Sequence, residues 1–178
     1  MKWLNEPLIW NEQNGLIEVT SEQNTDFWRT THYGFIRDNG HFYFEEVRGN
    51  FIAKVKVSGK YQELYDQAGL MVRLNKENWL KCGIELVEGV QQVSAVVTRD
   101  YSDWSIVPMP SNPASIWLQV TRKDSAIEIH YSIDNKQYTM LRMAYLTSVE
   151  TVEVGIMCAS PKGQGFTTVF AELKLESC

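Results

Sequence analysis

Apolar and polar residues alternate along much of this chain. In residues 67–74 (QAGLMVRL) the even-numbered positions are Ala, Leu, Val and Leu, and the odd-numbered positions are Gln, Gly, Met and Arg. Residues 80–86 (LKCGIEL) repeat the pattern, with Leu, Cys, Ile and Leu on one side and Lys, Gly and Glu on the other. A side-chain period of two predicts β-strands with one aliphatic face and one polar face.

Similar strand-like runs recur from end to end, and no helical pattern of useful length interrupts them. Turn residues separate several runs, as at Asp38-Asn39-Gly40, Lys123-Asp124-Ser125 and Asp134-Asn135-Lys136. The other predicted strands are residues 16–20, 41–44, 51–57, 92–99, 117–122, 126–133, 137–145, 149–158 and 166–175. Short strands at this spacing predict an all-β, antiparallel sandwich or barrel.

The length of 178 residues predicts a single domain covering residues 1–178. Residues 102–113 are the longest stretch without a clear pattern, and they contain Trp104 and three prolines. We expect this stretch to be a rim loop beside a binding face.

If the two opening strands are neighbours, their polar sides form one surface of the sheet. That surface is the candidate site, and it consists of Gln67, Met71, Arg73, Lys81 and Glu85. The amide, thioether and guanidinium of the first strand are unusual for a face that only needs to be hydrated, where Lys, Glu or Thr would be more common. The rival interpretation is an ordinary solvated charge ladder.

Composition narrows the possible functions. The net charge is -5 and basic residues do not cluster, so we expect no nucleic-acid partner. No run approaches the roughly 20 apolar residues that span a membrane, and the N-terminus lacks a signal-peptide pattern. Three widely spaced cysteines, two of them at apolar strand positions, favour reduced thiols and a cytoplasmic location. Aromatic residues make up 12% of the chain, which suits both strands and ligand-binding grooves.

Several short motifs together resemble a known family. They are residues 26–35 (DFWRTTHYGF), 65–73 (YDQAGLMVR), 81–85 (KCGIE), 94–98 (SAVVT) and 102–105 (SDWS). The chain thereby resembles a family of intracellular proteins of unknown function, also labelled regulation of enolase after a yeast member, within the concanavalin A-like lectin/glucanase superfamily. This resemblance implies a two-sheet jelly roll whose concave face is the usual ligand groove. It implies little about activity.

Individual side chains suggest roles on that face. Arg73 has a planar fork that grips carboxylates or sugar hydroxyls, and it is also the expected cross-strand partner of Glu85. Gly69 and Gly83 would leave room for a ligand. Trp28 beside Arg29 can stack a sugar ring, although core packing of Trp28 is equally compatible with the pattern, and Trp104 can form a groove wall.

Two other chemistries receive less support. His32, His41 and His130 lack metal-ligand spacing, so we expect no metal site and no cofactor. A retaining glycosidase of this fold would carry a second acid two positions after Glu85, but that position is Val87. A hydrolase or lyase would therefore need a distant partner such as Asp66 or Asp103.

Three functional hypotheses remain. The favoured one is a cytosolic binding or regulatory module that holds a carbohydrate or sugar-derived ligand in a polar-aromatic groove. The second is a glycoside hydrolase or lyase that uses Glu85. The third is a module that binds a metabolic enzyme through exposed aromatic residues such as Tyr101 and Trp104.

Overall fold

The computed structural model describes all of residues 1–178 and is entirely β, with sixteen strands and no helix. In chain order the strands are β1 Lys2–Leu4, β2 Ile9–Gln13, β3 Leu16–Thr20, β4 Phe27–Arg29, β5 Ile36–Asp38, β6 His41–Arg48, β7 Phe51–Gly59, β8 Gln67–Arg73, β9 Asn78–Val87, β10 Val90–Arg99, β11 Tyr101–Met109, β12 Ile116–Lys123, β13 Ala126–Ser132, β14 Thr139–Tyr145, β15 Thr151–Ala159 and β16 Thr167–Ser177.

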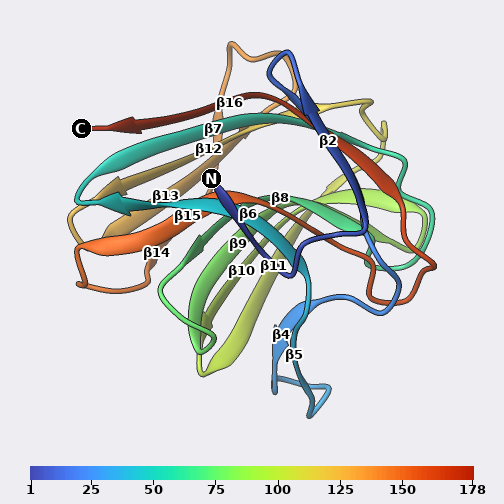
Figure 1. The fold of residues 1–178 in the computed structure, drawn as a ribbon, viewed down its shortest axis with the longest axis horizontal. Coiled ribbons are helices and arrows are strands. Elements are labelled where there is room, and N and C mark those ends of the chain that lie inside the picture. Colours follow the sequence, from blue (N-terminus) through green and yellow to red (C-terminus); the bar gives the residue numbers. More distant parts are fainter.

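Two seven-stranded antiparallel sheets stack to form a sandwich (Figure 1). The first sheet has the order β1-β6-β15-β8-β9-β10-β11, and the second has the order β14-β13-β12-β7-β16-β3-β2. A separate hairpin, β4–β5, hangs outside the first sheet (Figure 1). The predicted all-β sandwich is therefore confirmed, as is the turn that ends β5 at Asp38 and begins β6 at His41.

The main core lies between the sheets and is built by the alternation seen in the sequence. It contains 29 buried side chains, including Leu70 and Val72 of β8 and Cys82 and Ile84 of β9. Cys82 and Cys158 are buried and unpaired, and Cys178 is exposed.

Strands β8 and β9 are direct neighbours, as the sequence predicted, with Gln67 opposite Glu85 and Met71 opposite Lys81. Gly69 lies opposite Gly83, and a Cβ on either one would come within about 2 Å of a backbone oxygen of the facing strand. The prediction that these glycines leave room for a ligand is wrong, because the adjacent backbone occupies that space.

The β4–β5 hairpin covers part of the outer face of the first sheet. Phe27 and Trp28 of β4 pack there with seven other side chains in a second cluster, whose members are Phe27, Trp28, Phe42, Phe44, Met71, Trp79, Val96, Met157 and Ala159. The face that the alternation predicted to be polar is thus partly covered by the hairpin and partly apolar.

The segment predicted to be an irregular rim loop is mostly strand β11. Its residues pair with β10 in unbroken register, from Arg99 opposite Tyr101 to Gln91 opposite Met109. The prolines led to the wrong prediction, because Pro108 lies on an edge strand, where a missing N–H need not break a ladder hydrogen bond.

Since the structure consists of strands and loops, it contains no helix that could span a membrane.

Candidate functional site

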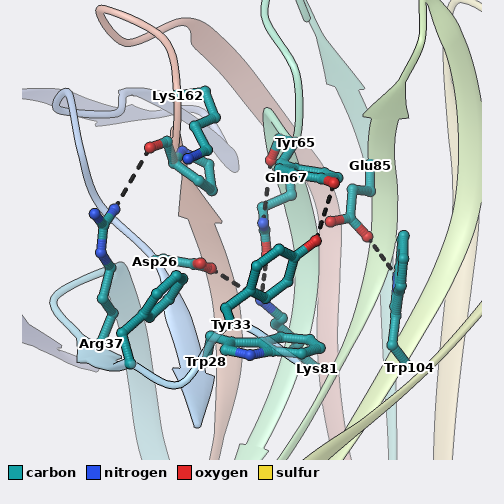
Figure 2. A pocket seen from close by; sticks show the side chains of 12 residues that line it. Asp26, Trp28, Tyr33, Arg37, Tyr65, Gln67, Lys81, Glu85, Trp104 and Lys162 are labelled. Carbon is teal, nitrogen blue, oxygen red and sulfur yellow. Dashed lines mark hydrogen bonds and ion pairs between the residues drawn. The ribbon is translucent and has the colours of Figure 1, made fainter. Parts of the chain in front are cut away.

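A pocket lies between the outer face of the first sheet and the β4–β5 hairpin (Figure 2). Strands β8 and β9 supply its polar wall, β4, β5 and their connection supply a second wall, and β11 closes one end. Its twelve lining residues are Asp26, Trp28, Tyr33, Phe35, Arg37, Tyr65, Gln67, Lys81, Glu85, Trp104, Pro161 and Lys162.

Lys81 is buried in this pocket with every N–H of its ammonium group paired. Its Nζ donates to Gln67 Oε1 at 2.5 Å, to the Phe27 carbonyl oxygen at 2.7 Å and to Asp26 Oδ1 at 3.3 Å. An ammonium group has three donors, so this set uses all of them. Lys81 therefore fixes the hairpin to the sheet and holds the Gln67 side chain in place.

Glu85 is the second buried ionisable group, with only 7% of its surface exposed. Trp104 Nε1 donates to Glu85 Oε2 at 2.9 Å, reaching it from the edge strand β11 (Figure 2). Burial raises the pKa of the Glu85 carboxyl, against the opposing effects of the Lys81 charge and of hydrogen bonds from Ser94 and Trp104. A carboxyl with a raised pKa inside a pocket can donate a proton or a hydrogen bond to a ligand, or accept one from it.

Two tyrosines meet across the pocket. Tyr33 Oη and Tyr65 Oη are 3.0 Å apart, which joins the hairpin tip to the start of β8 (Figure 2). Tyr65 has a φ of 70°, and Thr30 and His32 of the tip have φ values of 60° and 62°. Nine other non-glycine residues along the chain also have positive φ, so this conformation accompanies tight turns and does not by itself mark the pocket. The hydrogen bond with Tyr33 is the main reason that the pKa of Tyr65 is raised to about 12.

The enclosed part of the pocket is small, about 40 Å³. A wider groove of about 540 Å³ adjoins it and shares Trp28, Tyr33 and Trp104 with it. The enclosed part can hold a water molecule, which needs at least about 10–15 Å³, or a polar group of similar size. A ring-sized ligand therefore fits the groove, and smaller polar substituents fit the enclosed part.

Five of the eight residues proposed from the sequence line this pocket. They are Trp28, Gln67, Lys81, Glu85 and Trp104. Trp28 belongs to the second cluster as well, and its Nε1 donates to the Thr31 carbonyl oxygen at 2.9 Å. Trp104 is on a strand, not on the loop that the sequence predicted, and it stands edge-on to the ring of Tyr65.

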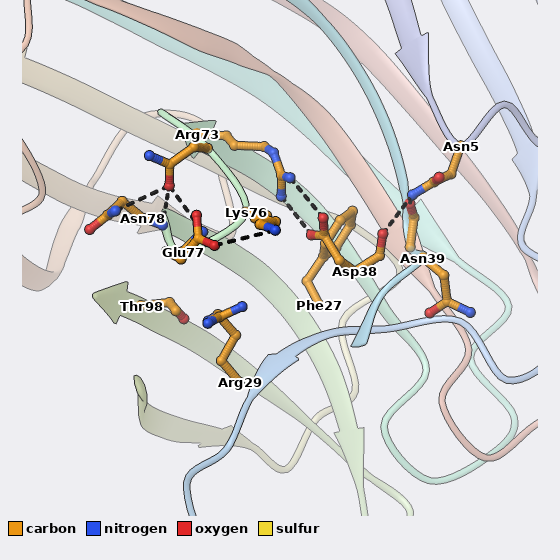
Figure 3. A network of polar contacts seen from close by, with 12 residues as sticks. Asn5, Phe27, Arg29, Asp38, Asn39, Arg73, Lys76, Glu77, Asn78 and Thr98 are labelled. Atoms are coloured by element: carbon orange, nitrogen blue, oxygen red, sulfur yellow. Dashed lines mark hydrogen bonds and ion pairs between the residues drawn. The ribbon is translucent and has the colours of Figure 1, made fainter. Parts of the chain in front are cut away.

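The other three lie elsewhere. Met71 has no exposed surface and packs in the second cluster. Arg73 does not pair with Glu85, so that prediction is wrong; its guanidinium grips Asp38 with bonds of 2.7 and 2.8 Å beside the Phe27 ring (Figure 3). Arg29 turns away and donates from Nε to the Asp100 carbonyl oxygen at 3.2 Å.

Neither acid suggested as a partner for Glu85 faces the enclosed pocket. Asp66 is fully buried, where it accepts hydrogen bonds from the Ser160 hydroxyl and from the backbone of Gln62 and Glu63. Asp103 forms an ion pair with Arg142 of the second sheet at 3.0 Å. The carboxylate that shares the pocket with Glu85 is Asp26, which the sequence offered only as part of a motif.

Other pocket residues were not singled out beforehand. Tyr33 and Phe35 follow Asp26 within the first motif, and Tyr65 opens the second motif, so motif membership was the available signal. Arg37 and Lys162 lay outside every motif, and only the folded chain places them at the pocket. No group of three or more histidine, cysteine, aspartate or glutamate side chains is arranged to hold a metal ion.

Comparison with known proteins identifies relatives along nearly the whole chain. A family described as "Protein of unknown function (DUF1349)" matches residues 3–178. "Regulation of enolase protein 1" of Saccharomyces cerevisiae is 39% identical over 173 residues, which cover 97% of this chain and 87% of the yeast protein.

Solved structures show the same fold. The crystal structure of a functionally unknown protein from Saccharomyces cerevisiae has a TM-score of 0.95 and 38% identity, covering 99% of this chain and 96% of that one. The carbohydrate-binding module CBM66 from Bacillus subtilis has a TM-score of 0.63 at 10% identity, covering 98% and 95%. At that identity the second likeness shows the fold alone, a concanavalin A-like jelly roll.

Proposed function

The chain belongs to the DUF1349 family of proteins of unknown function, and we propose that its pocket binds a small carbohydrate or sugar-derived ligand. The observation that carries the proposal is the buried Glu85 carboxyl, held by Trp104 in a pocket with aromatic walls. Ligand pockets combine apolar and aromatic walls with a few fixed polar groups. A sugar ring presents an apolar C–H face and a rim of hydroxyls, which is the complementary combination.

In the proposed complex the ring lies in the wider groove against Trp28 and Trp104. Its hydroxyls reach the enclosed part, where Glu85 and Gln67 offer polar atoms. Tyr33 lies between the two spaces, so the ligand displaces or stacks on its ring. The pairing of Lys81 supports this arrangement, because it holds the Gln67 amide in one orientation before a ligand arrives.

The test is ligand binding by calorimetry and tryptophan fluorescence, with Trp104→Ala compared with Trp117→Ala. Both are half-buried strand tryptophans whose Nε1 donates to a glutamate, Glu85 for Trp104 and Glu172 for Trp117. We expect Trp104→Ala to weaken binding by a factor of about ten or more, because stacking and a positioned hydrogen bond are both lost. Trp117→Ala should bind normally. A folded wild-type protein that binds no sugar or sugar derivative would refute the proposal.

A second candidate is glycoside hydrolysis, favoured by one specific observation. Glu85, with its raised pKa, shares the pocket with a second carboxylate, Asp26. Glycosidases use a protonated carboxyl as the general acid and a second carboxylate as nucleophile or base. Turnover of aryl glycosides by the wild type, abolished in Glu85→Gln, would support it; binding without turnover would leave the protein a binding module.

A third candidate follows from the name of the yeast relative, which suggests a metabolic enzyme as partner. Exposed apolar side chains occur along the edge strands β11 and β14, among them Tyr101 and Met143. Loss of enolase capture in Tyr101→Ala, with sugar binding unchanged, would support this role.

All three candidates would operate in the cytoplasm, which the unpaired cysteines favour.

A further inference from the structure

The pocket has a cationic end. Arg37 of β5 and Lys162, which follows Pro161 in the loop between β15 and β16, both line it (Figure 2). They lie at the end of the pocket away from Trp104 (Figure 2). Lys162 is exposed and Arg37 is half-buried, so a ligand in the pocket can reach both.

Neither cation has an acidic partner. The ion pairs of the structure involve Lys2, Arg48, Arg73, Lys76, Lys81 and Arg142, but not Arg37 or Lys162. The Arg37 guanidinium lies 5.0 Å from the centre of the Phe35 ring, and its Nη1 is 3.5 Å from the Pro161 carbonyl oxygen. These contacts orient the guanidinium and leave most of its five donors free.

The charges deeper in the pocket do not offset this end. Lys81 and Asp26 neutralise each other at 3.3 Å. Glu85 lies beside Trp104, at the other end of the pocket from Arg37 and Lys162, and forms no ion pair with either of them (Figure 2). A chain with a net charge of -5 therefore places two unpaired positive charges at the edge of its aromatic pocket.

We infer that the ligand is an acidic sugar or polyol, whose phosphate or carboxylate binds Arg37 and Lys162 while its hydroxyls reach Gln67 and Glu85. This inference rests on the proposed function and narrows it to one chemical class. A guanidinium fork matches the geometry of phosphate and carboxylate oxygens, and an ammonium group adds a second, mobile positive charge.

Binding of matched neutral and acidic sugars tests the inference. The probes are glucose, glucose 6-phosphate and glucuronate, then galactose, galactose 1-phosphate and galacturonate, with inorganic phosphate as the anion alone. We expect at least one acidic member to bind about tenfold or more tightly than its neutral parent. The ester and the uronate separate phosphate recognition from carboxylate recognition.

In the double variant Arg37→Ala/Lys162→Ala, the ratio of the affinity for the acidic sugar to that for its neutral parent should fall to near one. Its matched control is Arg99→Ala/Lys123→Ala, because Arg99 also lies over an aromatic ring, Tyr145 at 5.5 Å, and both control cations are exposed. The control should keep the preference, and unfolding curves should show that both variants are folded.

Three results would overturn the inference. Equal binding of neutral and acidic sugars would remove it and leave the proposed function standing. Binding of inorganic phosphate as tight as that of the phosphate esters would mean that the site recognises an anion without a sugar. If the folded protein binds none of the probes, both the proposed function and this inference are wrong.

Discussion

The pocket and the second cluster occupy the same face of the same sheet, beneath the same hairpin, but they differ in what the hairpin places against them. Over the second cluster, β4 inserts Phe27, which packs edge-on to Trp79 at 6.2 Å, and both rings are fully buried. Over the pocket, the hairpin supplies Asp26, Tyr33 and Arg37 instead, and a cavity remains.

The two regions also differ in how their charges are used. Arg73, at the border of the second cluster, is matched with Asp38 by two short hydrogen bonds (Figure 3). In the pocket Lys81 is paired with Asp26, but Glu85 has hydrogen bonds from Ser94 and Trp104 and no ion pair, and Arg37 has no acidic partner. Burial of a polar side chain alone therefore does not identify a site; incomplete pairing beside a cavity is the more informative feature.

The largest expected effect is on the second cluster. Phe27→Ala should lower the free energy of unfolding by about 3–5 kcal/mol, because a fully buried ring is replaced by a cavity. Phe35→Ala, at the half-buried edge of the pocket, should cost about 1 kcal/mol. Urea unfolding measures both. Equal costs would mean that the two regions are not packed differently.

Next in size is the removal of the Arg73 charge. Arg73→Met should cost about 2–3 kcal/mol, because it leaves the carboxylate of Asp38 without its buried partner. The comparison is Lys2→Met, which breaks an exposed ion pair with Glu46 and should cost less than about 1 kcal/mol. Sugar binding should be unchanged in both. A loss of binding in Arg73→Met would show that the second cluster is part of the site.

A smaller effect should depend on pH. The pKa of Glu85 is higher in the folded chain than its ordinary value of about 4.3, so the folded state favours the protonated carboxyl. The protonated Glu85 carboxyl contributes to the stability of the wild type. This contribution is fully present below the ordinary pKa and is lost as the pH rises through the raised pKa. Glu85→Gln lacks this loss, so its stability relative to wild type should increase as the pH rises from about 4 through the raised pKa.

Urea midpoints across that pH range would show the trend. Glu18→Gln is the control, since Glu18 is exposed on β3 of the second sheet and should show no such trend. If the difference in urea midpoint between wild type and Glu85→Gln does not change with pH, the Glu85 carboxyl is hydrated in the folded protein.

The smallest expected effect is on the contact across the pocket. Tyr33→Phe removes the hydrogen bond to Tyr65 and should cost about 0.5–1 kcal/mol of stability. The pKa of Tyr65 should fall from about 12 towards its ordinary value of about 10, because that bond is the main cause of its increase. Ultraviolet titration of the phenols measures the change, and Tyr138→Phe serves as the control. If the pKa of Tyr65 is unchanged in Tyr33→Phe, the two phenol groups are not hydrogen-bonded in solution.

Much of the fold could be predicted because strand alternation is a local property. Residues 67–74 and 80–86 show their buried aliphatic side directly, and the structure pairs them as β8 and β9. Strand β11 was missed because prolines obscured its pattern. The short strands β4 and β5 were missed because three residues are too few to display a period.

The candidate site could be predicted only in part. Gln67, Lys81 and Glu85 were found because they lie on the polar side of two strands that the sequence predicts to be neighbours. Alternation assigns a residue to one side of a strand, but it cannot show what covers that side. Met71, which packs in the second cluster, and Gln67, which lines the pocket, therefore look alike in the sequence.

The sequence by itself determined which residues form strands and which side of each strand enters the sandwich core, because both follow from the two-residue period of the backbone. Only the tertiary structure decided which part of the opposite face is filled and which stays hollow. That choice depends on contacts such as those of Lys81 with Asp26 and Phe27, which are 55 and 54 residues away along the chain. No local pattern encodes such contacts, since they form only when the hairpin and the sheet pack together.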